Sequence, residues 1–320
     1  MKLKNYKFWI RYSLSLILAI VIIYFIFSFM DIPILIKSLK NANIYPFLLA
    51  CFLNFFVMAS KGIRWYFVVK PHVRISPFQA VRLTILAFFI NSFIPARGGD
   101  IMRGIVAAKE TGGDAVTSIA SVGADKLMDM ITVFFLALGF PFLPELPGWV
   151  KEGTLFSLIG AYGLFILVII LSLKGHKYFE ERKNVRIYRV MHKLSSGLRA
   201  ISNPRIFVIL VLFSLLSYGF QLAMVFLSSL SAGIRLSLPE CACALLILNI
   251  AVSVPLTPLN LGTLHAAFTA ILVFFGFNKE SAMISSVVIH LAYTLPLFAI
   301  SPFLGVGTIM KQYRPQSTST

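Results

Sequence analysis

The sequence predicts an all-α, polytopic helical membrane protein with two re-entrant broken-helix hairpins that could form an inverted repeat. Three observations predict this class. First, 58% of the 320 residues are hydrophobic and only 13% are charged, a composition typical of a chain that crosses a bilayer several times. Second, the basic residues flank the apolar segments, as they do in membrane proteins. Third, proline and glycine interrupt two apolar segments, a pattern typical of transporter sites.

Nine apolar segments follow one another along the chain. The first comes after Lys2, Lys4, Lys7 and Arg11 and is too long for the apolar core of a signal peptide, so we expect a transmembrane helix there. In order, the segments span residues 12–30, 45–69, 78–94, 115–140, 154–173, 204–230, 240–254, 261–275 and 281–310. We expect one integral membrane domain over residues 1–310 and a short cytoplasmic tail over residues 311–320.

The net charge of +17 indicates orientation rather than nucleic-acid binding, because the basic residues border the apolar segments. Four of them lie in the first eleven residues, and nine lie in the loop 174–205 against two glutamates. Both regions are therefore expected at the cytoplasmic face. This places the protein in the inner cell membrane with both termini in the cytoplasm.

Segment 78–94 is predicted to dip into the membrane and return. If it crossed fully, the helices after it would place the basic loop 174–205 outside. Segments 240–254 and 261–275 are both shorter than the roughly 20 residues that a spanning helix needs. Pro255, Pro258 and Gly262 separate them, so we expect a second hairpin that enters from the outside.

The first break contains charges at the expected depth of the membrane. It carries Asn91, Arg97, Gly98, Gly99, Asp100 and Arg103. If a helix begins near Gly99, Asp100 caps it, and the free backbone N–H groups form an anion site. Arg97 and Arg103 could then hold a phosphate. The alternative is an interfacial loop whose arginines contact lipid headgroups.

Asp125 and Asp129 are four residues apart and share one helix face, with Asp114 as the expected N-cap. Two carboxylates at low dielectric repel, so one must be protonated or both must be paired. The neighbouring Lys126 is expected to point elsewhere. The candidate partners are Lys61, Arg64, Arg97 and Arg103. Two simpler interpretations are an ion-pair network that only locks helices together, and snorkelling of Lys61 and Arg64 to the interface.

The second break resembles the first. Pro95 precedes Gly99 by four residues, and Pro258 precedes Gly262 by four. Each break follows an apolar run that contains one asparagine, Asn91 or Asn249, and each is followed by Arg103 or His265. Either an inverted repeat or coincidence explains this match. Asn260 and His265 are candidates for the site, whereas His290 is expected to be an isolated core histidine.

The remaining motifs carry little chemistry. The sequence contains no G-x-S-x-G, H-E-x-x-H, P-loop or C-x-x-C motif, so hydrolase or ATPase chemistry of the soluble type has no support. Cys51, Cys241 and Cys243 lie in apolar runs, where free cysteines usually pack. We expect no catalytic residue, no metal and no cofactor.

Four motifs in order resemble the transmembrane region of lysylphosphatidylglycerol synthases. They lie at residues 61–65, 91–103, 124–129 and 255–266. This chain has Asp125-Lys126 where the family often has Glu-Arg, Leu259 and Asn260 where it has glycines, and His265 where it has Glu. The resemblance implies a lipid flippase-like domain without the soluble synthase domain, so lipid aminoacylation is not implied.

The sequence therefore predicts a flippase-like protein that binds and translocates a phospholipid or lipid-linked headgroup. The expected partner is a membrane lipid with an anionic or zwitterionic headgroup, together with a possible separate lipid-modifying enzyme, and no nucleic acid. The alternatives are a membrane-embedded transferase and an accessory subunit of a lipid or lipid-linked glycan enzyme. Asp125, Asp129 and His265 would balance charge or relay protons. The oligomeric state is not indicated.

Overall fold

The structure, a computed structural model, describes residues 42–93, 98–137, 159, 163, 166, 203–253 and 257–305. Every secondary-structure element within these ranges is helical, which confirms the predicted all-α class. The predicted segment 12–30 lies outside the described residues, as do all but three residues of segment 154–173.

In the part of the chain that the structure describes, eight α-helices form two groups of four with the same order of lengths: long, short, short, long. The first quartet consists of α3 (Ile44–Val69), α4 (Pro77–Phe93), α5 (Gly98–Thr111) and α6 (Ala115–Ala137). The second quartet consists of α10 (Pro204–Ser231), α11 (Leu238–Ser253), α12 (Thr263–Phe274) and α13 (Lys279–Ile300). This shared order favours the repeat interpretation over coincidence.

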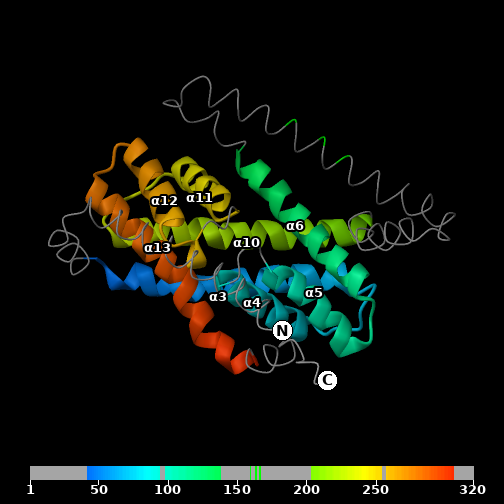
Figure 1. Cartoon of the computed structure of the whole chain (residues 1–320). Helices are drawn as coiled ribbons and strands as arrows, with labels where there is room; N and C mark the ends of the chain where they lie inside the picture. Colours follow the sequence, from blue (N-terminus) through cyan, green and yellow to red (C-terminus); the bar gives the residue numbers. More distant parts are fainter. Residues whose placement is uncertain are drawn as a thin grey trace, which may run out of the picture.

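The long helices α3 and α10 pack side by side along the length of the molecule (Figure 1). At one end the Asn43 N–H donates to the Ser231 carbonyl at 2.9 Å. Further along, Arg64 on α3 donates to Ser214 on α10. Because later residues of α3 meet earlier residues of α10, the two helices are antiparallel.

Helices α4 and α5 form an antiparallel pair, and they pack closely where Gly99 of α5 meets α4. The Gly99 N–H donates to Asn91 Oδ1 at 2.8 Å near the break, and Arg82 pairs with Glu110 at the other end. A Cβ on Gly99 would lie 2.2 Å from the Ala87 carbonyl oxygen. The two helices can approach this closely only because residue 99 has no side chain.

Helices α11 and α12 form the corresponding pair in the second quartet. The short 3₁₀ turn η5 (Pro258–Asn260) lies between them, and its residues Leu259 and Asn260 have positive φ angles of 58° and 54°. The pair α4–α5 follows the end of α3, and the pair α11–α12 follows the end of α10. Since α3 and α10 are antiparallel, the two pairs open toward opposite ends of the molecule (Figure 1).

Three of the described helices are long and apolar enough to cross a membrane: α3, α10, and α13 continued by η6 (Ser301–Leu304). The apolar helices α4, α11 and α12 are shorter, as the sequence predicted. Helix α6 has 23 residues but carries Asp125, Lys126 and Asp129. How deeply the short pairs enter the bilayer stays a prediction.

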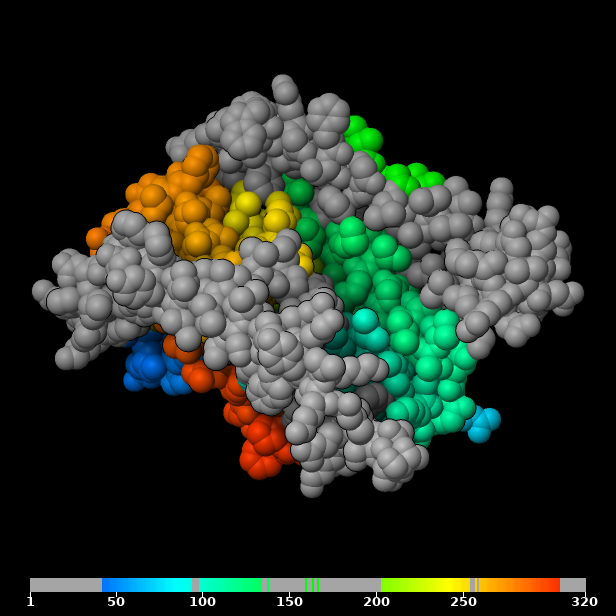
Figure 2. Space-filling view, in the orientation of Figure 1, coloured from blue at the N-terminus to red at the C-terminus, as the bar shows by residue number. Residues whose placement is uncertain are grey.

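Two apolar cores occupy opposite ends of the α3–α10 pair. The first surrounds Trp65, Leu83 and Met128 of the first quartet. The second surrounds Phe268 and Ile289 of the second quartet. Helices α6 and α11 meet between these ends, where green and yellow atoms adjoin in Figure 2.

Candidate substrate-binding site

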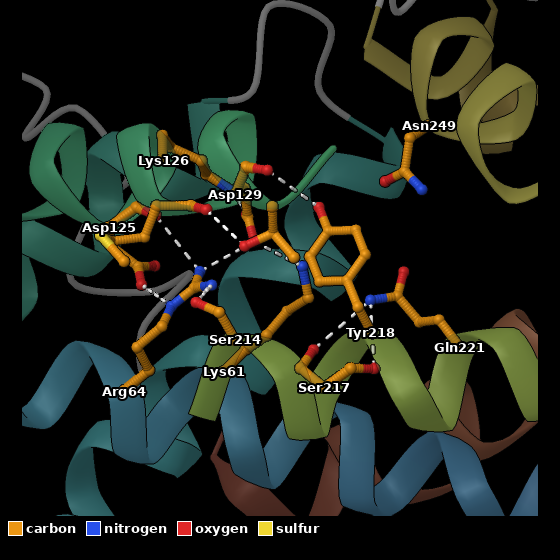
Figure 3. A network of polar contacts seen from close by, with 12 residues as sticks. Lys61, Arg64, Asp125, Lys126, Asp129, Ser214, Ser217, Tyr218, Gln221 and Asn249 are labelled. Carbon is orange, nitrogen blue, oxygen red and sulfur yellow. Dashed lines mark hydrogen bonds and ion pairs between the residues drawn. The ribbon is translucent and has the colours of Figure 1, made fainter. Parts of the chain in front are cut away.

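Arg64 is the centre of a buried charge network (Figure 3). Its side chain is 0% exposed. Its Nε lies 2.7 Å from Asp125 Oδ1, its Nη2 lies 2.8 Å from Asp129 Oδ1, and its Nη1 donates to Ser214 Oγ at 2.9 Å. Arg64 thus joins α3, α6 and α10. The interpretation of Arg64 as a snorkelling residue is wrong, because its charged end faces α6 and α10 rather than the interface.

Arg103 binds the other oxygen of Asp125. Its Nη2 lies 3.1 Å from Asp125 Oδ2, and its Nη1 donates to Thr84 Oγ1 at 2.9 Å. The guanidinium also lies 4.4 Å from the ring centroid of Trp65, in cation–π contact. Both Asp125 oxygens are therefore paired with arginines, which is one of the two arrangements that the sequence left open.

Two lysines complete the network at its more exposed edge. Lys61 Nζ lies 2.9 Å from Asp129 Oδ1. Lys126 Nζ lies 3.2 Å from Asp100 Oδ2 and 3.9 Å from Asp129 Oδ2. The prediction that Lys126 points elsewhere is wrong. Lys126 and Asp129 are three apart on α6 and so share a face, and the packing of α5 on α6 brings Asp100 to the same lysine.

The network has more positive than negative charge among the described residues. It consists of Lys61, Arg64, Arg103 and Lys126 against Asp100, Asp125 and Asp129. The two arginine side chains are buried, whereas Lys126 is 26% exposed. The surplus positive charge can therefore reach a ligand most directly through the lysines.

A cavity of about 250 Å³ lies against these lysines, between the two quartets. The first quartet and its charges form one wall with Asn54, Lys61, Asn91, Asp100, Lys126 and Asp129. The second quartet supplies Gln221, Asn249, Asn260, His290, Tyr293 and Thr294. Apolar side chains, among them Met58, Phe88 and Leu264, fill the space between the polar groups.

The first break reaches this cavity through Asn91 and Asp100. Helix α5 begins at Gly98, and Asn91 rather than Asp100 accepts the Gly99 N–H. Asp100 lies inside the first turn, not before it, so it is not the cap that the sequence predicted. Its carboxylate faces Lys126 instead. Arg97 lies outside the described residues, and its predicted role stays a prediction.

At the second break, Asn260 lines the cavity. His265 is not among the lining residues, but it contacts His290, which is. His265 Nε2 is 3.0 Å from His290 Nδ1, and His290 lines the cavity. The expectation that His290 is an isolated core histidine is wrong, because α12 and α13 run antiparallel and bring it against His265. Only their tertiary packing reveals this pair.

Sequence reasoning missed several polar residues of the cavity. Asn54 donates from Nδ2 to the Tyr293 carbonyl at 2.9 Å, and the Gln221 amide donates to the Ser217 carbonyl at 3.3 Å. The signal was present in the sequence, since an amide inside a long apolar segment needs a polar environment. In Figure 3, Asn249 lies apart from the ion pairs, on its own helix.

The described residues contain no group of three or more His, Cys, Asp or Glu side chains placed to hold a metal ion. Cys241 and Cys243 are buried, and Cys241 belongs to the second apolar core. These cysteines therefore act in packing.

Comparison with known proteins places this architecture among membrane proteins. Two UPF0104 membrane proteins of Methanocaldococcus jannaschii are similar to this chain. One is 24% identical, and the match covers 58% of this chain and 79% of the relative. The other is 23% identical, and the match covers 89% of this chain and 91% of the relative. A UPF0104 membrane protein of Methanothermobacter thermautotrophicus is 20% identical, and the match covers 85% of this chain and 87% of the relative. No solved structure matches the chain. The family model of the lysylphosphatidylglycerol synthase TM region matches residues 12–301, so the chain belongs to that family of membrane proteins.

Proposed function

We propose that this protein is a flippase-like membrane protein that binds the headgroup of a phospholipid or lipid-linked molecule in the cavity and moves it across the cell membrane. The observation that carries the proposal is the cavity itself. It lies between two helix quartets whose short helix pairs, α4–α5 and α11–α12, open toward opposite ends of the molecule, and one wall carries a surplus of positive charge. Sites between such repeats are typical of transporters.

The charge of the cavity wall favours an anionic group on the ligand. Lys61 and Lys126 line the cavity, and each already pairs with a carboxylate. The buried arginines satisfy Asp125 completely. The network therefore retains one positive charge that a phosphate would compensate through charge-assisted hydrogen bonds. This supports an anionic or zwitterionic phospholipid headgroup.

The size of the cavity favours a headgroup without its tails. A volume of about 250 Å³ is below the roughly 300–1,000 Å³ of pockets that enclose drug-sized ligands. The acyl or isoprenoid chains would stay in the bilayer while the headgroup crosses. Polar groups on both walls would replace the water that a headgroup loses on leaving the membrane surface.

The contacts between the quartets suggest how the headgroup could move. The turn η5 contacts α4, and α11 contacts α6, on two sides of the cavity. Arg64 and its partners hold α3, α6 and α10 as one unit. A shift of α11–α12 relative to this unit would open the cavity on one side and close it on the other.

Purified protein in liposomes tests this proposal. The assay follows acyl-labelled fluorescent phospholipids by reduction of the fluorophore in the outer leaflet. Lys61→Gln and Lys126→Gln should slow translocation by about tenfold or more, because each removes a charged contact to the phosphate. Arg74→Gln, at an exposed loop position, is the matched control. Equal rates in protein-free and wild-type liposomes would reject translocation.

A further inference from the structure

Three polar atoms of the second quartet have no hydrogen-bond partner within the part of the chain that the structure describes. They are Asn260 Oδ1, His290 Nε2 and Tyr293 Oη. All three atoms are buried, and all three residues line the cavity. Buried polar atoms nearly always have a hydrogen-bond partner. Three unpartnered atoms in residues around one cavity therefore point to a ligand that forms hydrogen bonds with them.

The fold brings these three residues together. His290 and Tyr293 are three residues apart on α13 and so share one face. In η5, Leu259 and Asn260 have left-handed backbone conformations. The Leu259 backbone lies close to the His290 ring, which brings η5 against α13. The three residues therefore form a wall that belongs to the second quartet alone.

The hydrogen-bond chain behind His290 decides which of its nitrogens carries the proton. Ser286 Oγ donates to the Met283 carbonyl at 2.6 Å, so at 3.3 Å it can only accept from His265 Nδ1. His265 Nε2 then accepts the proton of His290 Nδ1. In this neutral arrangement His290 Nε2 is an acceptor, and it has no hydrogen-bond partner among the described residues.

The wall requires a partner that both donates and accepts hydrogen bonds. Asn260 Oδ1 and His290 Nε2 need donors, whereas the Tyr293 hydroxyl has a proton to give. A phosphate oxygen only accepts and an ammonium group only donates, but a hydroxyl group does both. The cavity-lining carboxylates, Asp100 and Asp129, belong to the other quartet and pair with lysines. An ammonium group would therefore lack a counter-charge here.

We infer that Asn260, His290 and Tyr293 form a second subsite, which binds hydroxyl groups of a polyol headgroup. This inference rests on the proposed function, because the lysine wall binds the phosphate of the same headgroup. The cavity thus has an ionic end and a neutral end, and it suits a phosphodiester whose polar end is a glycerol or a cyclic polyol. Lipids with the same charge but no hydroxyl groups would leave the three orphan atoms unsatisfied.

Binding of short-chain lipids to the purified protein in detergent tests the subsite. The probe is dioctanoyl phosphatidylglycerol, and the matched lipid is dioctanoyl phosphatidylmethanol, a phosphodiester of equal charge without hydroxyl groups. Wild-type protein should bind the glycerol lipid about tenfold more tightly, since each hydrogen bond contributes roughly fivefold. Tyr293→Phe removes one hydroxyl and should reduce this preference about fivefold. Tyr45→Phe, at an exposed position, should not change it.

Further lipids separate the possible outcomes. Selective binding of phosphatidylinositol as well would support the subsite and extend it to a cyclic polyol. Equal binding of the glycerol and methanol lipids would overturn the subsite, because water alone would then satisfy the orphan atoms. Tighter binding of phosphatidylethanolamine would overturn the choice of hydroxyl over ammonium. Selective binding without translocation in liposomes would reject the proposed function while the subsite stands.

Discussion

His265 Nε2 lies 3.0 Å from His290 Nδ1, and this contact joins the third and fourth helices of the second quartet. The Arg103–Asp125 pair joins the third and fourth helices of the first quartet at 3.1 Å. The same architectural position thus carries an ion pair in one quartet and a neutral imidazole pair in the other. The two quartets therefore give the cavity between them two chemically different walls.

The first prediction concerns the stability that depends on Arg64. Arg64→Ala should lower the free energy of unfolding by about 3–5 kcal/mol, because it leaves Asp125 and Asp129 short of a buried counter-charge. Denaturant unfolding in detergent measures the change. Arg74→Ala, an exposed arginine near the end of the same helix, should change it by no more than about 0.5 kcal/mol. A similar small loss for Arg64→Ala would mean that the network contributes little to the fold.

The second prediction concerns the glycine at the first break. Gly99→Ala places a methyl group 2.2 Å from the Ala87 carbonyl oxygen, so α5 must move away from α4. We expect a loss of about 1–3 kcal/mol in unfolding free energy together with slower translocation. Gly123→Ala is the matched control, because no atom lies within 4 Å of the added carbon. It should be neutral or stabilising by up to about 1 kcal/mol. Equal effects of the two variants would contradict close packing at Gly99.

The sequence was sufficient for most of the described helices and for most of the charge network. Apolar segments delimit α3, α4, α10, α11 and α12 within a few residues, because membrane helices are long runs of one composition. The spacing of Asp125 and Asp129 placed both on one helix face. Buried carboxylates require cations, which pointed correctly to Lys61, Arg64 and Arg103.

The remaining contacts depend on how helices pack, which a single sequence does not specify. Lys126 turns toward Asp100 because α5 lies against α6. His265 meets His290 because α12 and α13 are antiparallel and in register. The Gly99 N–H donates a hydrogen bond to Asn91, eight residues earlier, because the chain folds back at the break and places α5 against α4. Local spacing gives the face of a helix but not the neighbour that the face meets.

The third prediction tests the surplus positive charge of the network. Lys126→Glu changes that surplus of one positive charge into a deficit of one, so an anionic headgroup should meet repulsion at the cavity wall. The affinity for dioctanoyl phosphatidylglycerol should fall by at least about tenfold. Lys279→Glu makes the same change in net charge at an exposed site and should leave the affinity within about twofold. Equal losses for both variants would indicate only a long-range effect of net charge.

The fourth prediction tests the opposite orientation of the two helix pairs in the membrane. The turn before α4 and the start of α13 lie at opposite ends of the antiparallel helices α3 and α10, so cysteines placed there should face opposite compartments. In a background with Cys51, Cys241 and Cys243 replaced by serine, Arg74→Cys should react with an impermeant maleimide only from the cytoplasmic side. Lys279→Cys should react only from the outside. Both positions are exposed, so accessibility depends on sidedness. Labelling of both from one side would contradict the topology that the positive loops predict and, with it, a cavity that opens alternately to the two faces.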